Sequence, residues 1–537
     1  MKNRVCGRDW VYGLGALCIA LALTIGQITP VQAAGNTLIR GIGDNWETLD
    51  PQLVQSTKDS IIEGDLYEGL VGVDAAGNPI PGAAESWDIS ADGLTYTFHL
   101  RPNLKWSNGD PLVAQDFVNG MRRVIEPETA SYKAYYLSLQ LPIVGAADYN
   151  GGSGDFSAVG IKAPDDRTVV INLTVLCPQA LILLNFYTTA PLHTSSWEAF
   201  GKDFVNPGNV VTNGAYVTKE VVQQSHVLAV KNPNYWDAAN VKIDAVKFLV
   251  TSDITTELRQ YEAGEVDVTY EVPDDALARM KKERPAELHL SPLARSNFIS
   301  FNQNKAPLTD IRIREALALA IDRVTLQERI LKVGDLPIMS HVPQVIPDYP
   351  HLKPATMTGD YAQDVARAQQ LMAESGYGPG NPLTLDFYCF ADDVSKRQAQ
   401  AVGIMWQQKL GVVSRYTFQE TQAHYDTFYN YEWDAYCDSS GGDYVGAESF
   451  LIYRAKAAEA GYNWDSPKYE EIMAQVAQQA DMAKRNELLA QAEQVLLDDY
   501  IMAPLSNVVR RSLITPRLTG WIDNPIEYHL TKYLTLQ

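Results

Sequence analysis

The hydrophobic pattern of this chain changes its period near residue 305, and this change constrains the fold more than any other feature. Before it, apolar and polar residues alternate, as at 94–101, which is typical of half-buried β-strands. After it, amphipathic helical segments alternate with strand-like runs, which predicts a parallel sheet with crossover helices. The helical segments are 310–331, 364–378 and 395–411, and the strand-like runs are 383–390 and 432–437.

Further segments complete this division into two halves. Apolar β-type runs lie at 168–175, 243–251, 266–272 and 297–304. Ser466-Pro467 predicts the start of a long helical region that reaches about residue 499, because Ser is a common N-cap and Pro a common first helical residue. At 537 residues the chain exceeds what one core usually supports, so we expect two to four domains.

The N-terminus predicts export. A basic start precedes a mostly apolar run at 10–25, and small residues at Val31 and Ala33 suit a signal-peptide cleavage site, so we expect a signal peptide over 1–33. An uncleaved membrane anchor is the alternative, which the shortness of the run disfavours. Lipid attachment at Cys18 is disfavoured because Leu17 stands where a small residue is needed. We therefore expect the mature protein to be soluble and exported.

The charge of the chain excludes some partners. Its formal net charge is −21, and loss of the three basic residues and one acidic residue of the signal peptide makes it −23. Such a chain repels nucleic acid and anionic lipid, so we expect neither as a partner.

The cysteines suggest a single disulfide. Of five, Cys6 and Cys18 leave with the signal peptide, which leaves an odd number in an oxidising compartment. Cys389 and Cys437 both end strand-like runs, which favours their pairing and leaves Cys177 free. Three buried thiols are the alternative.

The loop CDSSGGDYVGAESF, at 437–450, follows a strand-like run, and ligands bind at such strand ends in α/β sheets. Its glycines accompany Asp438 and Asp443 without a nearby base, which argues against phosphate. The spacing does not match a calcium-binding loop. A carboxylate on a glycine-rich loop suits a ligand ammonium group. Alternatively, Asp443 caps a helix that begins near Gly446-Ala447, or it lies in a solvated turn.

No catalytic constellation stands out. The eight histidines lack metal-ligand spacing, and no G-x-S-x-G motif is present. Paired carboxylates carry little information in so acidic a chain. We therefore expect neither an enzyme nor a cofactor.

Several segments resemble the periplasmic peptide-binding proteins of ABC transporters (bacterial extracellular solute-binding protein family 5), and the similarity is greatest to the oligopeptide and murein-peptide binders. The segments follow the order of the family over nearly the whole mature chain. They are AESWDISADGLTYTFHLRPNLKWSNGDPLVAQDF (84–117), TLDP (48–51), DLYEGL (65–70), NPGNVVTNGAY (206–216), NPNYW (232–236), YEAGEVDV (261–268), DIRIREALALAIDR (310–323) and YIMAPLSN (500–507).

The resemblance implies an α/β, periplasmic binding protein-like fold, with two α/β lobes joined by a hinge and an additional smaller α+β lobe. Lobe I is expected to be discontinuous, lobe II to be an insertion, and the ligand to be enclosed between lobes I and III. The implied ranges are 34–67, 191–294 and 509–537 for lobe I, 68–190 for lobe II and 295–508 for lobe III. The implied partners are a short peptide and a membrane ABC permease, and the receptor is expected to be a monomer.

The resemblance also implies ligand-binding residues. Asp443 falls on the aspartate that receives the α-ammonium group of the ligand. The segments 437–442 and 54–60 fall where the ligand main chain is held. These segments contribute the candidates Ser439, Ser440, Gly441, Gly442 and Thr57.

The chain departs from the family around this aspartate. An arginine, a tryptophan and a cysteine of the oligopeptide binders fall on Cys437, Ser440 and Gly441. The upstream pocket tryptophan and arginine fall on Thr421 and Phe428.

Other departures concern the two ends of the ligand. The carboxylate-receiving histidine falls on Ser395, and a tyrosine near the amino end falls on Lys133. The partner of the family cysteine falls on Arg295, so the disulfide of the family is absent. Arg454, Arg295 and Lys133 are candidate carboxylate partners.

These features predict a receptor for short peptides. The same fold could instead bind a murein fragment, a metal chelate or haem, because a fold does not determine its ligand. An exported chaperone or hydrolase is the alternative from another class of function.

Overall fold

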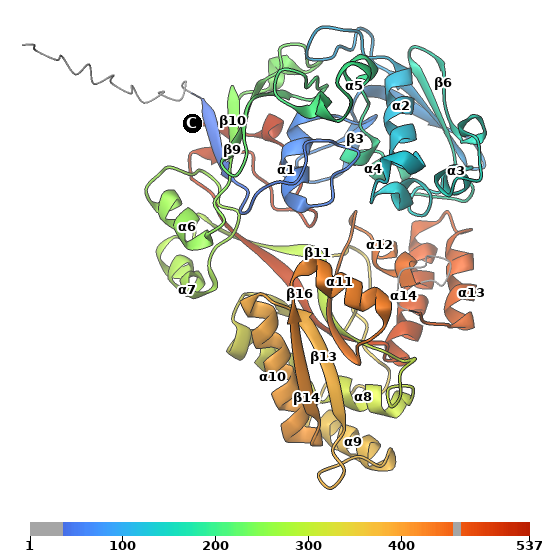
Figure 1. Ribbon diagram of the computed structural model, residues 1–537, viewed down its shortest axis with the longest axis vertical. Coiled ribbons are helices and arrows are strands. Elements are labelled where there is room, and N and C mark those ends of the chain that lie inside the picture. Colours follow the sequence, from blue (N-terminus) through green and yellow to red (C-terminus); the bar gives the residue numbers. More distant parts are fainter. Residues whose placement is uncertain (1–35, 455–462) are drawn as a thin grey trace, which may run out of the picture. The chain divides into compact units, whose positions relative to one another are not determined.

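The computed structural model describes residues 36–454 and 463–537, so the predicted signal peptide lies outside the described residues. Sheets of four, four and six strands dominate this part of the chain (Figure 1). No described helix is both long enough and apolar enough to cross a membrane.

The first sheet contains β1 (Thr37–Gly41), β8 (Tyr216–Val222), β9 (His226–Lys231) and β10 (Ala245–Leu249). Its order is β1-β10-β9-β8, with β1 parallel to β10 and the other neighbours antiparallel. Helix α1 (Thr57–Leu66) packs near β8. The Ser56 side chain caps α1 by accepting a hydrogen bond from Asp59 N at 3.2 Å.

The second sheet is antiparallel throughout, with the order β4-β5-β7-β6. Its strands are β4 (Ala84–Ile89), β5 (Thr95–Leu100), β6 (Ile161–Asp165) and β7 (Thr168–Asn172). Tyr96, Phe98 and Leu100 are buried and alternate with more exposed residues, which confirms the half-buried strand predicted there. Helix α2 (Ala114–Ile125) contacts β6 and β7.

The third sheet has six strands in the order β12-β16-β11-β15-β13-β14. They are β11 (Leu288–Phe301), β12 (Leu336–Pro337), β13 (Thr384–Phe390), β14 (Val413–Gln419), β15 (Ala435–Gly441) and β16 (Met502–Leu513). The prediction of a parallel sheet is correct only for the pairs β13–β14 and β13–β15. The other pairs are antiparallel, because β16 returns alongside β11 from far along the chain.

Helices cover this sheet. Helix α8 (Ile311–Leu319) contacts β16, helix α9 (Tyr361–Glu374) packs on α8, and helix α10 (Asp393–Leu410) contacts β13 and β14 (Figure 1). Helices α9 and α10 confirm the two predicted helical segments.

The prediction of one helix over 310–331 is wrong. Helix α8 ends at Leu319, and a π-helix, η7 (Thr325–Leu331), follows after a break. Within the break, buried Arg323 donates to Pro504 O at 2.6 Å, and the Asp322 side chain accepts from Thr325 N at 2.9 Å. These side-chain bonds replace the helical hydrogen bonds that a continuous helix requires.

The long helical region after Ser466 is also divided. Ser466 is the N-cap of α13 (Pro467–Val476), with Pro467 at its start as predicted. Helix α14 (Met482–Asp498) starts separately, with the Asp481 side chain accepting from Lys484 N at 3.1 Å. A second helix cap within the segment explains the division.

The apolar run at 266–272 is not a strand. Val268 forms isolated bridges with Arg40 and Ile514. The remaining elements are short or peripheral. They are β2 (Val71–Val73), β3 (Pro79–Pro81), β17 (Leu518–Thr519), β18 (Thr535–Leu536), α3 (Ala146–Asn150), α4 (Ala180–Leu183), α5 (Thr194–Phe200), α6 (Ile254–Glu262), α7 (Asp274–Glu283), α11 (Thr421–Asn430), α12 (Glu448–Leu451) and the 3₁₀ turns η1 (Pro127–Thr129), η2 (Ala134–Leu137), η3 (Phe156–Ala158), η4 (Tyr187–Thr189), η5 (Gly201–Val205), η6 (Ala238–Asn240), η8 (Ile452–Arg454) and η10 (Thr531–Tyr533).

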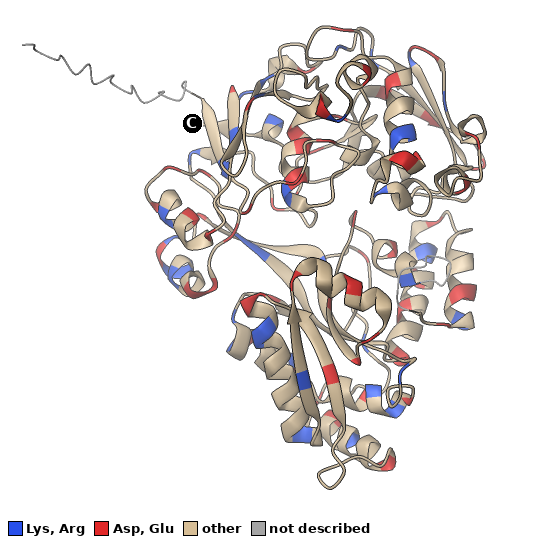
Figure 2. Ribbon diagram, viewed as in Figure 1, with Lys and Arg blue, Asp and Glu red and all other residues tan. Residues whose placement is uncertain are grey.

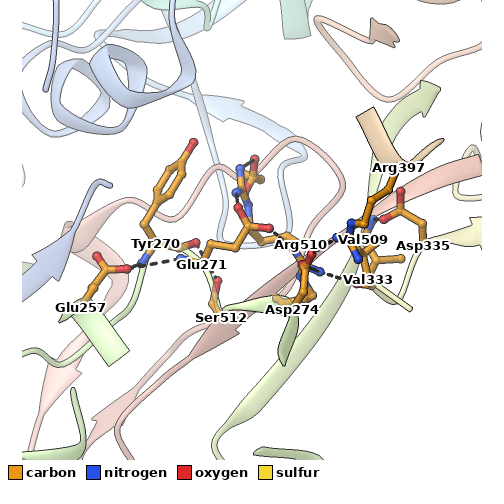
Figure 3. A network of polar contacts seen from close by, with 12 residues as sticks. Glu257, Tyr270, Glu271, Asp274, Val333, Asp335, Arg397, Val509, Arg510 and Ser512 are labelled. Atoms are coloured by element: carbon orange, nitrogen blue, oxygen red, sulfur yellow. Dashed lines mark hydrogen bonds and ion pairs between the residues drawn. The ribbon is translucent and has the colours of Figure 1, made fainter. Parts of the chain in front are cut away.

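A polar network holds the C-terminal part of β16 (Figure 3). Arg511 of β16 donates to Asp274 Oδ1 at 2.8 Å and also contacts Glu271. Arg397 of α10 donates to the other oxygen of Asp274 at 2.7 Å. Asp335 accepts from Val509 N of β16 at 3.0 Å. The network therefore ties α7 and α10 to β16.

Candidate functional site

A cavity of about 770 Å³ is lined by the end of β15, the start of α1 and residues 525–530. This volume lies in the usual range for small-molecule sites. Its wall includes every predicted ligand-binding residue except Thr421. Those residues are Thr57, Lys133, Arg295, Ser439, Ser440, Gly441, Gly442, Asp443 and Arg454. Thr421 is the exposed first residue of α11 and does not line the cavity.

The loop after β15 enters the cavity in a fixed conformation. Gly442 N donates to Ala294 O of β11 at 2.8 Å. A Cβ atom at residue 442 would lie only 2.9 Å from Tyr444 O and 3.0 Å from a ring carbon of Phe450. Any side chain at residue 442 would force these neighbours to shift, so glycine is favoured at the position that precedes Asp443.

Asp443 does not cap a helix, so that alternative is wrong. Helix α12 starts at Glu448, and its N-cap residue is Ala447. The Asp443 carboxylate instead accepts a hydrogen bond from Tyr453 Oη at 3.0 Å and contacts Gln140 Nε2. Asp443 and Tyr453 both line the cavity.

Lys133 forms an ion pair with Asp443, at 3.4 Å between Nζ and Oδ1. The two side chains are only 10% and 14% exposed, so water screens the pair little. Burial would lower the pKa of Lys133, but Asp443, Tyr135 and Tyr187 together raise it above its usual value, which keeps the ammonium group charged. Lys133 thus occupies a position on Asp443 that the resemblance assigns to a ligand.

Arg454 is a buried residue of the cavity wall. Its Nη2 lies 3.3 Å from His341 Nε2, and its guanidinium lies over the Phe298 ring at 5.3 Å. Burial lowers its pKa to about 10, against the opposing effect of Asp438. Burial raises the pKa of Asp438 to about 6, and Arg454 opposes this rise. The two groups therefore interact electrostatically.

Arg295 has a different environment, because it is exposed on β11 directly across from Gly441 of β15. A Cβ atom at residue 441 would lie 3.4 Å from Arg295 Nε and 3.6 Å from Nη2. The guanidinium thus lies over the glycine backbone. No carboxylate of the described residues comes within ion-pair distance of it.

Aromatic side chains form much of the remaining wall, and the sequence analysis did not identify them as site residues. Tyr425 and Tyr429 of α11 are 47% and 56% exposed, and Tyr132 is 59% exposed. The i, i+4 spacing of Tyr425 and Tyr429 places both on one helix face, which is a detectable signal of a shared surface. Large exposed rings of this kind suit ligand binding.

A disulfide braces β15 next to the cavity. Cys389 of β13 is bonded to Cys437 of β15, with 4.8 Å between the Cα atoms. Cys177 is free and buried. His424, stacked on Tyr436, lies 3.0 Å from Cys437 O through Nε2. The strand is therefore held firmly just before it enters the site.

The site offers no metal centre in the part of the chain described, where no three His, Cys, Asp or Glu side chains are grouped to hold an ion. The cavity, walled by main chain, aromatic rings and paired charges and lined by residues of the first and third sheets, has the features of a site that binds a small solute.

Comparison with known proteins identifies the family. The family described as bacterial extracellular solute-binding proteins, family 5 (Middle), matches residues 78–462. The periplasmic oligopeptide-binding protein OppA of Salmonella typhimurium is 34% identical over 512 residues, which cover 95% of this chain and 94% of that protein. The probable deoxycholate-binding periplasmic protein YgiS of Escherichia coli is 32% identical over 492 residues, which cover 91% of each.

A solved structure agrees with these relatives. The crystal structure of Haemophilus influenzae OppA in complex with RPPGFSPFR has a TM-score of 0.82 and 30% identity, and the match covers 94% of this chain and 99% of that one. The chain belongs to the bacterial extracellular solute-binding proteins of family 5.

Proposed function

We propose that this protein is a periplasmic receptor that encloses short peptides and delivers them to an ABC-type permease. The observation that carries this proposal is the free edge of β15 inside the cavity. Residues 437–441 pair with β11 on one side, whereas β13 pairs on the other side only with Ala435 and Tyr436. Among the described residues, no strand covers the second edge of 438–441. An extended peptide can add main-chain hydrogen bonds to such an edge.

This mode of binding suits ligands of varied sequence. Main-chain hydrogen bonds are the same for every peptide, and the exposed tyrosines offer flat apolar faces that many side chains can contact. Waters in a cavity of about 770 Å³ can bridge the remaining polar groups. Thr57, at the start of α1, supplies a hydroxyl on another part of the wall.

We infer that the cavity closes by movement of lobes about β11 and β16. The range proposed for lobe I contains the sheet β1-β10-β9-β8, that for lobe II the sheet β4-β5-β7-β6, and that for lobe III most of the six-stranded sheet. Strands β11 and β16 are the described strands that cross the proposed boundaries near 295 and 508. The Lys133–Asp443 pair joins lobe II to lobe III. We expect a monomer whose closed form docks on the permease.

No enzymatic role is proposed. The relatives described above are named as binding proteins. Figure 2 shows basic and acidic residues interspersed on the described elements in that view, which offers no basic stripe for nucleic acid. Measurable turnover of a peptide library would contradict this assignment.

Native mass spectrometry of the gently purified mature protein tests the proposal. We expect a mixture of masses above that of the chain, and the released species should be short peptides. A single non-peptide species would refute the peptide assignment. If the protein emerges empty, a thermal-shift screen with a short-peptide library must raise the melting temperature; no shift with any pool would also refute it.

A non-peptide carboxylate is the second candidate ligand. The Lys133–Asp443 pair favours it, because a site whose aspartate is already neutralised does not need a ligand amine. A relative named for probable deoxycholate binding supports this candidate by analogy only. Detection of such an anion in the same mass spectra would distinguish it from a peptide.

A further inference from the structure

The wall of the cavity holds more positive than negative side chains, although the whole chain has a formal net charge of −21. Burial and the nearby Arg40 lower the pKa of His529 to about 3, so this histidine is neutral near pH 7. The charged side chains of the wall are the cations Arg40, Lys133, Arg295 and Arg454 and the carboxylates Asp438, Asp443 and Glu527. A local excess of positive charge in an acidic protein favours an anionic ligand.

The carboxylates of the wall are already engaged. Asp443 pairs with Lys133, and Asp438 interacts with Arg454. Both oxygens of Glu527 are bound by Arg510, whose Nη2 lies 2.8 Å from Oε2 and whose Nε contacts Oε1. A ligand cation therefore meets no carboxylate that lacks a protein counter-ion among the described residues.

Three of the four cations are engaged as well. Besides Lys133 and Arg454, buried Arg40 donates from Nη1 to His529 O at 2.8 Å and lies over the Trp521 ring at 5.4 Å. Arg295 differs, because it is exposed and no described carboxylate lies within ion-pair distance. It is the cation that can bind an incoming anion without breaking an internal pair.

The position of Arg295 suits this role. It pairs in register with Gly441, at the end of the strand whose free edge is proposed to bind the ligand main chain. The guanidinium lies next to this glycine, since a Cβ atom there would be in van der Waals contact with Nε and Nη2 of Arg295. Its planar fork can bind a carboxylate through two hydrogen bonds.

The carboxylate that a ligand ammonium group would bind is already occupied by side chains of the protein itself. The Asp443 carboxylate receives Lys133, Tyr453 and Gln140. An incoming amine must displace a buried lysine ammonium from its only described carboxylate partner, which leaves that charge without compensation.

We propose that Arg295 binds an anionic group of the ligand, and that the site does not require a free ligand amine because Lys133 already fills the ammonium position on Asp443. This inference rests on the proposed peptide-binding function and names the substrate class: peptides with a free carboxylate, including those whose amino end is blocked.

Titration calorimetry with one short-peptide library in four chemical forms tests this inference. The forms have both ends free, the amino end acetylated, the carboxyl end amidated, or both ends blocked. The proteins are the wild type, Arg295→Gln, Arg295→Lys and the control Arg415→Gln. Arg415 is an exposed arginine of β14 in the same sheet, outside the cavity.

We expect amidation to weaken binding to the wild type about tenfold, and acetylation to change it by less than about threefold. Arg295→Gln should bind peptides with a free carboxylate about tenfold more weakly than the wild type does, and should bind the free and amidated peptides equally well. The affinity of Arg295→Lys should lie between these two, and Arg415→Gln should match the wild type. Because Arg295 is exposed, its variants should fold normally, and equal melting temperatures check this.

The outcomes separate this inference from the proposed function. If acetylation abolishes binding while amidation has no effect, the ligand is held by its amine and the inference is wrong, although the protein is still a peptide receptor. Unchanged discrimination in Arg295→Gln overturns it equally. If no form of the library binds the wild type, the peptide function and the inference both fail.

Discussion

Replacing Asp443 by Asn tests the buried ion pair that crosses the cavity. The charged atoms of Lys133 and Asp443 are 3.4 Å apart, and their side chains are 10% and 14% exposed. An effective dielectric constant of about 20 gives a Coulomb attraction of about 5 kcal/mol at such a distance, part of which offsets desolvation. Removal of one partner of a buried pair costs about 3–5 kcal/mol, because the other charge is left uncompensated.

We therefore expect Asp443→Asn to lower the free energy of unfolding by about 3 kcal/mol. Lys133→Met should cost about 2 kcal/mol, since Tyr453 and Gln140 still donate to the remaining carboxylate. The double variant should cost less than about 2 kcal/mol, which gives a coupling energy of about 3 kcal/mol.

Urea denaturation followed by both tryptophan fluorescence and circular dichroism measures these values, provided that the two transitions coincide. Asp393→Asn is the matched control. Asp393 is 95% exposed and lies 3.9 Å from Lys396, so it should change stability by less than about 0.5 kcal/mol. Additive costs for the two single variants, or costs as small as that of the control, would refute the reasoning that Lys133 fills the ammonium position.

Three other perturbations have expected results. Removing the Cys389–Cys437 disulfide by double substitution with alanine, which opens a loop of 48-residue separation, should cost up to about 4 kcal/mol of unfolding free energy in urea. Burial raises the pKa of Glu257 from 4.5 to about 7, so its contribution to stability is full below pH 4.5 and lost as the pH rises toward 7. The free energy of unfolding of the wild type, relative to that of Glu257→Gln, should thus fall by about 3 kcal/mol between pH 4.5 and pH 7. If this difference does not change with pH, the pKa of Glu257 is not raised. Gly442→Ala should cost about 1–3 kcal/mol and weaken peptide binding, because its Cβ meets the Tyr444 carbonyl oxygen; unchanged affinity would show that the loop tolerates a side chain.

Local patterns in the sequence predicted those elements whose hydrogen bonds are local. Strand β5 and helices α9 and α10 follow from residue periodicity, and Ser466 marks the start of α13. The segment 310–331 has helical periodicity too, yet Arg323 turns inward to bind a carbonyl of β16, and this distant partner breaks the helix. The strand directions of the third sheet likewise depend on β11 meeting β16 across a long separation.

In the candidate site, too, the sequence predicted what depends on neighbouring residues and missed the contacts between distant ones. The position of Asp443 after a strand-like run was visible in the sequence, and the resemblance gave the loop its expected role. Its pairing with Lys133, 310 residues away, was not visible, because no local pattern relates residues on opposite sides of a cavity. Tyr425 and Tyr429 share a helix face, but only the packing of α11 decides that this face lines the cavity.

The two cross-links around β15 connect its stability to its proposed selectivity. The resemblance places a family disulfide at positions 295 and 441, which here are Arg295 and Gly441 facing each other between β11 and β15. The structure instead joins β15 to β13 through Cys389 and Cys437, on the opposite edge of the strand. Because this bond braces β15 from the other side, the pair at 295 and 441 no longer needs to hold the strand. A guanidinium can therefore occupy that position and line the cavity, so the different position of the disulfide is what makes room for the proposed binding of a ligand anion by Arg295.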